Sequence, residues 1–91
     1  MVSVRQVKAA RALLGWSQYE LADKSGVSKP TVARLETADG ELGGYAATRD
    51  KLVAALAAAG IVFTNGNEPG VKLRAAGGTI PLDDLSAAND E

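Results

Sequence analysis

The chain has 91 residues, with ten basic and eleven acidic side chains and neither histidine nor cysteine. This length fits one domain with one modest core. The absent residue types exclude disulfides, thiol chemistry and the usual zinc ligands, so we expect no metal and no cofactor. No apolar run is long enough to cross a bilayer, and the start lacks the apolar core of a signal peptide, which together predict a cytoplasmic protein.

The charges are distributed unevenly along the chain. Residues 1–35 hold six basic and two acidic side chains, a balance of +4, whereas residues 36–91 hold four basic and nine acidic ones, a balance of −5. A basic segment can attract nucleic acid locally even when the whole chain carries a net charge of −1. The excess of basic side chains in residues 1–35 could also belong to an ordinary solvated surface with no binding role.

A first helix is predicted from Ser3 to Gly15. Ser3 and Gln6 have the spacing of a capping box, in which each side chain binds the other residue's backbone N–H. Glycine at position 15 takes the left-handed conformation that ends a helix. Residues at helical spacing form the inward face: Val4, Val7, Ala10, Arg11 and Leu14.

Two further short helices follow on either side of Gly26. Ser17 and Glu20 form a second capping box, and Ser28 caps the next helix. Pro30 lies in the first turn of that helix, where a missing N–H costs nothing. The apolar or small residues that would pack the two helices together are Leu21, Ala22, Val27, Val32 and Leu35.

The remaining chain reads as a loop, a helix, a hairpin and a tail. Residues 37–45 hold three glycines and two acidic residues and predict a loop. An alanine-rich helix over 46–59 is followed by two short strands, 61–65 and 70–74. Residues 75–91 hold four acidic residues and no basic one, and we expect a flexible acidic tail.

These elements predict a mainly α fold, a small helical bundle followed by a β-hairpin and the tail. The predicted divisions are a helix-turn-helix DNA-binding domain over 1–60, a hairpin over 61–74 and the tail over 75–91. Two short helices joined at a glycine form a helix-turn-helix, whose second helix can enter the major groove of DNA. The side chains near the start of that helix that face outward are Lys29, Pro30, Thr31, Ala33 and Arg34. Arginine can bind both guanine acceptors, and threonine can give a hydroxyl or methyl contact.

The stretch RALLGWSQYELADKSGVSKPTVARLE resembles the phage-repressor-type family, also called Xre or lambda-repressor-like, and the resemblance extends over about residues 4–59. It implies a DNA-binding bundle that usually binds operators as a homodimer. It makes the five outward residues the base-contact set and implies a structural ion pair between Arg11 and Glu36. The contacts to the DNA backbone are expected from Ser17, Gln18, Tyr19 and Ser28.

Several of these residues have a second interpretation. Gln18 could bind phosphate, support a neighbouring recognition side chain, or simply begin its helix well. Trp16 is expected to fill the core rather than stack on a base. Asp39 and Glu41 in the loop should repel phosphate, so backbone contacts from that loop are not expected.

The hairpin lies beyond the part of the chain that resembles the family. Its apolar residues alternate with polar or smaller ones, so one face is apolar, and an isolated hairpin is barely stable in water. That face could pack on the fourth helix, on a second protomer, or on both. We expect a homodimer whose contact includes Ile61, Phe63, Val71 and Leu73.

The leading hypothesis is a sequence-specific DNA-binding regulator, most simply a repressor that binds an inverted-repeat operator. The alternative is a protein-interaction module such as an antitoxin or anti-activator, whose acidic tail could fold on a partner. An enzyme is not expected, because a serine nucleophile would lack its usual base and no phosphate loop or metal-ligand spacing is present.

Overall fold

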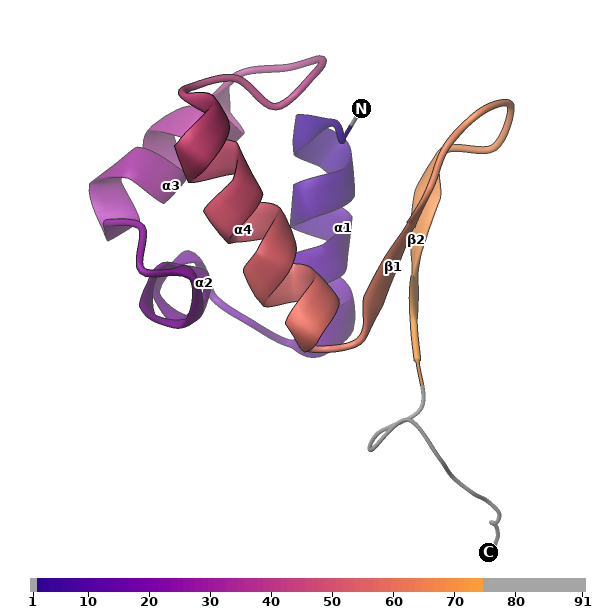
Figure 1. The fold of residues 1–91 in the computed structure, drawn as a ribbon, viewed down its shortest axis with the longest axis horizontal. Helices are drawn as coiled ribbons and strands as arrows, with labels where there is room; N and C mark the ends of the chain where they lie inside the picture. The colour runs from indigo at the N-terminus through magenta and orange to yellow at the C-terminus, as the bar shows by residue number, and fades with distance from the viewer. Residues whose placement is uncertain (1, 75–91) are drawn as a thin grey trace, which may run out of the picture.

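The computed structural model describes residues 2–74 and consists of four helices followed by a two-stranded antiparallel hairpin (Figure 1). The elements are α1 Val4–Leu14, α2 Gln18–Ser25, α3 Lys29–Thr37, α4 Ala46–Ala58, β1 Ile61–Thr64 and β2 Gly70–Leu73. The predicted mainly α fold is therefore confirmed, while the predicted flexible tail falls outside the described residues. Within residues 2–74 no helix has the length and apolarity needed to cross a membrane.

The helix starts and stops predicted from the sequence are present. The hydroxyls of Ser3 and Ser17 each accept the backbone N–H of the third helical residue, and both capping boxes are complete. Ser28 caps α3 in the same way. Gly15 and Gly26 take positive φ angles of 70° and 76°, which glycine adopts without strain. Local sequence signals therefore set both ends of α1 and α2 and the start of α3.

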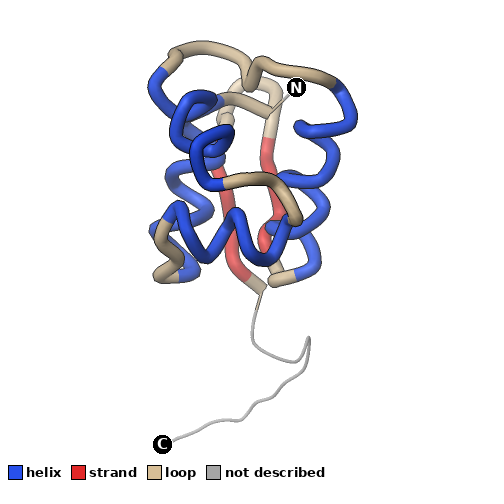
Figure 2. The backbone as a smooth tube through the Cα atoms, turned by 90° about the vertical axis from the view of Figure 1, so that its left-hand side faces the viewer, coloured by secondary structure: helices blue, strands red, loops and turns tan. Residues whose placement is uncertain are grey.

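Figure 2 shows the helices in front of the two strands. The buried core is formed by residues of all four helices, of the loop after α3 and of β1. Leu21, Leu52 and Leu56 are fully buried and come from α2 and α4. Trp16 packs against this core, as expected. The other buried apolar side chains are Val4, Val7, Ala10, Ala22, Val27, Val32, Leu35, Leu42 and Ile61.

The loop between α3 and α4 is fastened to the start of the chain. The Val4 N–H donates to the Gly40 carbonyl at 2.9 Å, and the Leu42 N–H donates to the Val2 carbonyl at 3.0 Å. Leu42 is buried with only 4% of its surface exposed. These contacts hold the first part of the loop against the start of α1.

The hairpin packs mainly along α1, with β2 lying on that helix and β1 also touching α4. In the register, Ile61 faces Leu73 and Phe63 faces Val71. Ile61 is buried, Phe63 and Val71 are partly buried against the core, and Leu73 is 42% exposed. The sequence suggested α4 or a second protomer as the support for this face, but the structure places most of it on α1.

Gln6 is the residue that joins α1 to both strands. Its side-chain oxygen completes the capping box by accepting the Ser3 N–H at 2.9 Å. Its amide nitrogen donates to the carbonyl oxygens of Thr64, at 2.7 Å, and Gly70, at 3.0 Å. Gln6 is only 5% exposed, so water cannot easily replace these bonds.

The variant Gln6→Glu tests this connection, because it keeps the size and the acceptor but removes the donor. A carboxylate would face two carbonyl oxygens, so we expect a loss of about 2 kcal/mol or more in the free energy of unfolding at pH 7. Lowering the pH should restore part of the loss, since a protonated carboxyl can again donate. Urea unfolding of both proteins at pH 7 and pH 4 measures this effect, and equal stability at pH 7 would show that the amide contributes nothing.

Candidate DNA-binding site

The corner between α2 and α3 fixes the direction of α3. The two helices pack against each other, and Val27 lies beneath the corner with 8% of its surface exposed. Ala22 on α2 and Val32 on α3 are both buried. Because these residues hold one side of α3 in the core, the opposite side must face solvent.

The predicted base-contact residues all lie on α3, on or beside its exposed face. Lys29, Pro30 and Arg34 are exposed, and Thr31 and Ala33 are half-buried. Lys29 is the first residue of the helix, and Arg34 lies in its last turn. The structure therefore places two cations and one hydroxyl on a short helix that is supported from behind.

The predicted backbone-contact residues lie at the starts of α2 and α3. Ser17, Tyr19 and Ser28 are exposed, with Tyr19 at 73%, whereas Gln18 is half-buried. The Ser17 hydroxyl accepts the Glu20 N–H at 3.1 Å, which leaves its own proton free to donate. Tyr19 is the aromatic member of this group, and most of its surface is exposed.

Arg11 and Glu36 form a two-pronged ion pair between α1 and α3. Arg11 donates from Nε to Glu36 Oε2 at 2.9 Å and from Nη2 to Glu36 Oε1 at 2.7 Å. The side chain of Glu36 is 3% exposed and that of Arg11 is 20% exposed. Paired donors of this kind match the geometry of a carboxylate, which is the arrangement a buried charge requires.

Two more bonds extend this ion pair, and neither follows from the sequence pattern. Gln18 donates from Nε2 to Glu36 Oε1 at 3.1 Å, which links the start of α2 to α3. Arg11 also donates from Nη1 to the Trp16 carbonyl at 3.0 Å, in the turn before α2. Gln18 is thus a structural partner of the ion pair, whatever else it contacts, and one of its amide protons is already committed.

The pKa of Glu36 is lowered from its ordinary value of 4.5. Burial alone would raise this pKa, but hydrogen bonds from Arg11 and Gln18 and the positive charges of Arg11 and Lys8 outweigh it. Glu36 therefore stays ionised at neutral pH and holds its partners as an acceptor.

The acidic part of the loop after α3 lies at the start of α1. Asp39 forms an exposed ion pair with Arg5, with 3.4 Å between the carboxylate oxygen and Nε. Glu41 pairs with Ser3 in a short backbone bridge. The first half of the loop is therefore engaged with α1.

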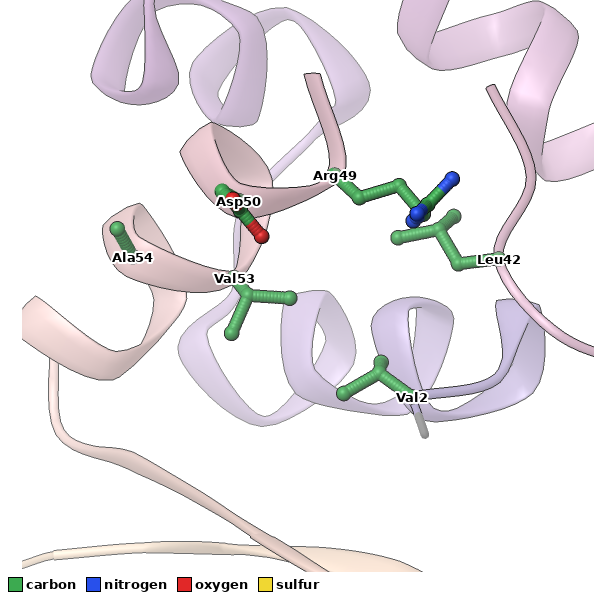
Figure 3. A pocket seen from close by; sticks show the side chains of 6 residues that line it. All are labelled: Val2, Leu42, Arg49, Asp50, Val53 and Ala54. Carbon is green, nitrogen blue, oxygen red and sulfur yellow. The ribbon is translucent and has the colours of Figure 1, made fainter. Parts of the chain in front are cut away.

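A pocket lies between the start of α1, the loop and α4 (Figure 3). Val2, Leu42 and Val53 point toward its interior, and Arg49 and Asp50 are its charged lining residues. Within residues 2–74 no three acidic side chains gather closely enough to hold a metal ion. The pocket is largely apolar, and none of its lining residues lies on α3.

The chain matches the helix-turn-helix family model over residues 7–59. A comparison with curated proteins finds no match. The chain therefore belongs to the helix-turn-helix family of the Xre or lambda-repressor type, whose members are DNA-binding transcription regulators. The matched segment contains the corner, α3 and the Arg11–Glu36 ion pair described above.

Removing one partner of the ion pair should destabilise the fold strongly. In Glu36→Ala the Arg11 guanidinium would remain partly buried without its carboxylate, and we expect a loss of about 3–5 kcal/mol in the free energy of unfolding. The matched control is Asp39→Ala, which removes the carboxylate of an exposed ion pair and should cost less than about 1 kcal/mol. Equal melting temperatures for Glu36→Ala and the wild type would contradict the role of the pair.

The same ion pair should make stability depend on acid pH. The folded-state pKa of Glu36 lies below its unfolded value, so its contribution is fully present above pH 4.5 and is lost as the pH falls through the folded pKa. Urea midpoints between pH 7 and pH 2 should therefore fall less steeply for Glu36→Gln, which cannot ionise, than for the wild type. If the urea midpoints of the two proteins fall in parallel with pH, the ionisation of Glu36 does not cause the pH dependence of stability.

Proposed function

We propose that this regulator binds a specific inverted-repeat DNA operator as a homodimer and acts as a repressor. The observation that carries the proposal is α3, a helix of the family's recognition type whose buried side is fixed by the core and whose free side presents Lys29 and Arg34. A helix that lies in the major groove can present its exposed side chains to the base edges and so read sequence directly.

In this proposal each exposed group of α3 has a separate task. Arg34 donates to the acceptors of a guanine, and Thr31 binds a neighbouring base through its hydroxyl or methyl group. Lys29 adds positive charge, while Pro30 and Ala33 allow close approach without polar bonds of their own. Recognition of the base sequence therefore depends on few side chains.

The DNA backbone is held from the starts of α2 and α3. Tyr19 donates its hydroxyl to a phosphate, and the free N–H groups at the start of α2 add partial positive charge there. The bond from Gln18 to Glu36 keeps that helix start in register with α3. The Ser17 hydroxyl accepts the Glu20 N–H and can still donate its own proton to a phosphate.

A second protomer is needed to read both halves of an inverted repeat, with the two recognition helices about 34 Å apart. The hairpin lies at the end of the molecule away from α3 (Figure 1), so a contact there leaves both recognition helices free. Ile61 is buried in its own protomer and acts as support, while Leu73 and the outer parts of Phe63 and Val71 are available for the partner.

DNA binding should depend on salt and on Arg34. Gel-shift titrations with an inverted-repeat duplex from the region upstream of the reading frame should give a log–log salt slope of about −4 to −7, for roughly five to eight phosphate contacts per dimer.

The variant Arg34→Ala should lose about 1–3 kcal/mol of binding free energy and relax the preference at one base pair in each half-site. The control Arg74→Ala removes the same charge from the hairpin and should leave the preference intact. Equal loss on specific and random DNA for Arg34→Ala would contradict the base contact, and the absence of any DNA shift would favour a protein-interaction module.

The dimer contact should depend on Leu73. In sedimentation velocity runs, Leu73→Asp should raise the dimer dissociation constant about tenfold or more, because it places a charge in an apolar contact. Tyr45→Asp is the control, since Tyr45 is 85% exposed but lies at the start of α4. A chain that ends at Arg74 should dimerise like the full chain. If Leu73→Asp dimerises as well as the wild type, the hairpin does not form the dimer contact and only covers the core of its own chain.

A further inference from the structure

Two hydroxyl groups meet at the start of α3. Ser28 donates from Oγ to Thr31 Oγ1 at 2.8 Å, and the Thr31 backbone N–H donates to Ser28 Oγ at 3.4 Å. Ser28 is exposed and Thr31 is half-buried, and both lie at the end of the helix that enters the groove in the proposed complex. The two side chains therefore form one unit at the place where bases would be read.

The direction of the bond between the two hydroxyls decides which of them can still donate to DNA. A hydroxyl has one proton and two lone pairs. When Ser28 donates to Thr31 across this 2.8 Å contact and accepts the Thr31 N–H, its side chain has no proton left for a phosphate oxygen. The Thr31 oxygen receives the proton of Ser28 and keeps its own proton, which must point away from Ser28.

We infer that Ser28 is a positioning residue that makes Thr31 a hydrogen-bond donor toward DNA. This inference rests on the proposed function and goes beyond it. The base opposite Thr31 is then selected for a major-groove acceptor, such as guanine O6 or N7, adenine N7 or thymine O4. Ser28 sets sequence preference through its side chain, in place of the phosphate contact that the sequence predicted for it.

The first part of the test locates the base that Thr31 reads. The full wild-type chain is used to select binding sites from a random duplex pool, and the affinity for all four base pairs is then measured at each position of the selected site. One position in each half-site should favour an acceptor by about fivefold, the worth of one hydrogen bond. Thr31→Val, which keeps the shape but lacks the hydroxyl, should abolish the preference at that position alone.

The second part reverses the polarity of the hydroxyl pair. Ser28→Asp keeps an N-cap acceptor but has no proton to give, so its carboxylate accepts the Thr31 proton and leaves only lone pairs facing the DNA. Preference at the same position should then move to cytosine, because its major-groove edge offers only the N4 donor. Ser17→Asp is the matched control, because it places the same charge at the N-cap of α2. It should weaken binding to all sequences alike and leave the Thr31 preference unchanged.

A third variant provides a neutral check, since glycine is tolerated at an N-cap. Ser28→Gly frees the Thr31 hydroxyl to rotate, and the preference at its position should fall below about twofold. A preference unchanged from wild type in both Ser28 variants, with the proteins folded by circular dichroism, would overturn the inference while leaving the proposed function intact. Failure of the wild type to select any site would overturn both.

Discussion

The fold depends on one buried ion pair, that between Arg11 and Glu36. A carboxylate with 3% of its side chain exposed is unfavourable unless hydrogen-bond donors surround it, and here Arg11 supplies two. Gln18 supplies a third donor, and Arg11 uses its remaining terminal nitrogen on the Trp16 carbonyl. One charged cluster thereby connects α1, the turn after it, the start of α2 and the end of α3. Because α3 carries the residues proposed to contact the bases, the cluster also sets the orientation of the proposed DNA-binding surface.

Much of this arrangement could be predicted because its causes are local. Ser3, Ser17 and Ser28 satisfy backbone groups within three residues of themselves, so their sequence spacing contains all the necessary information. Gly15 and Gly26 mark left-handed positions that other residues avoid. The ion pair was predicted from the family resemblance, and Arg11 also stood on the predicted inward face of the first helix, where a charge needs a partner.

The contacts that could not be predicted join parts of the chain that are far apart. Gln6 fits a capping box completely, so nothing in the pattern shows that its amide also binds the carbonyls of Thr64 and Gly70, which are 58 and 64 residues away. The apolar face of the hairpin predicts that another element packs against it, but the pattern does not show which helix this is. In the structure α1 makes most of the contacts with the hairpin. From the sequence, Asp39 and Glu41 predicted only that the loop is negatively charged. Their contacts with Arg5 and Ser3 could not be predicted, because these contacts depend on the tertiary structure.

The central claim is that Arg11 and Glu36 act as one unit, and a double-mutant cycle tests it most directly. The free energy of unfolding is measured in urea for the wild type, Arg11→Met, Glu36→Leu and the double variant. Each single variant leaves a charge without its partner, whereas the double variant leaves none, so the double variant should lose less than the sum of the single losses. We expect a coupling energy of about 2 kcal/mol or more. Losses that add to within about 0.5 kcal/mol would contradict the account.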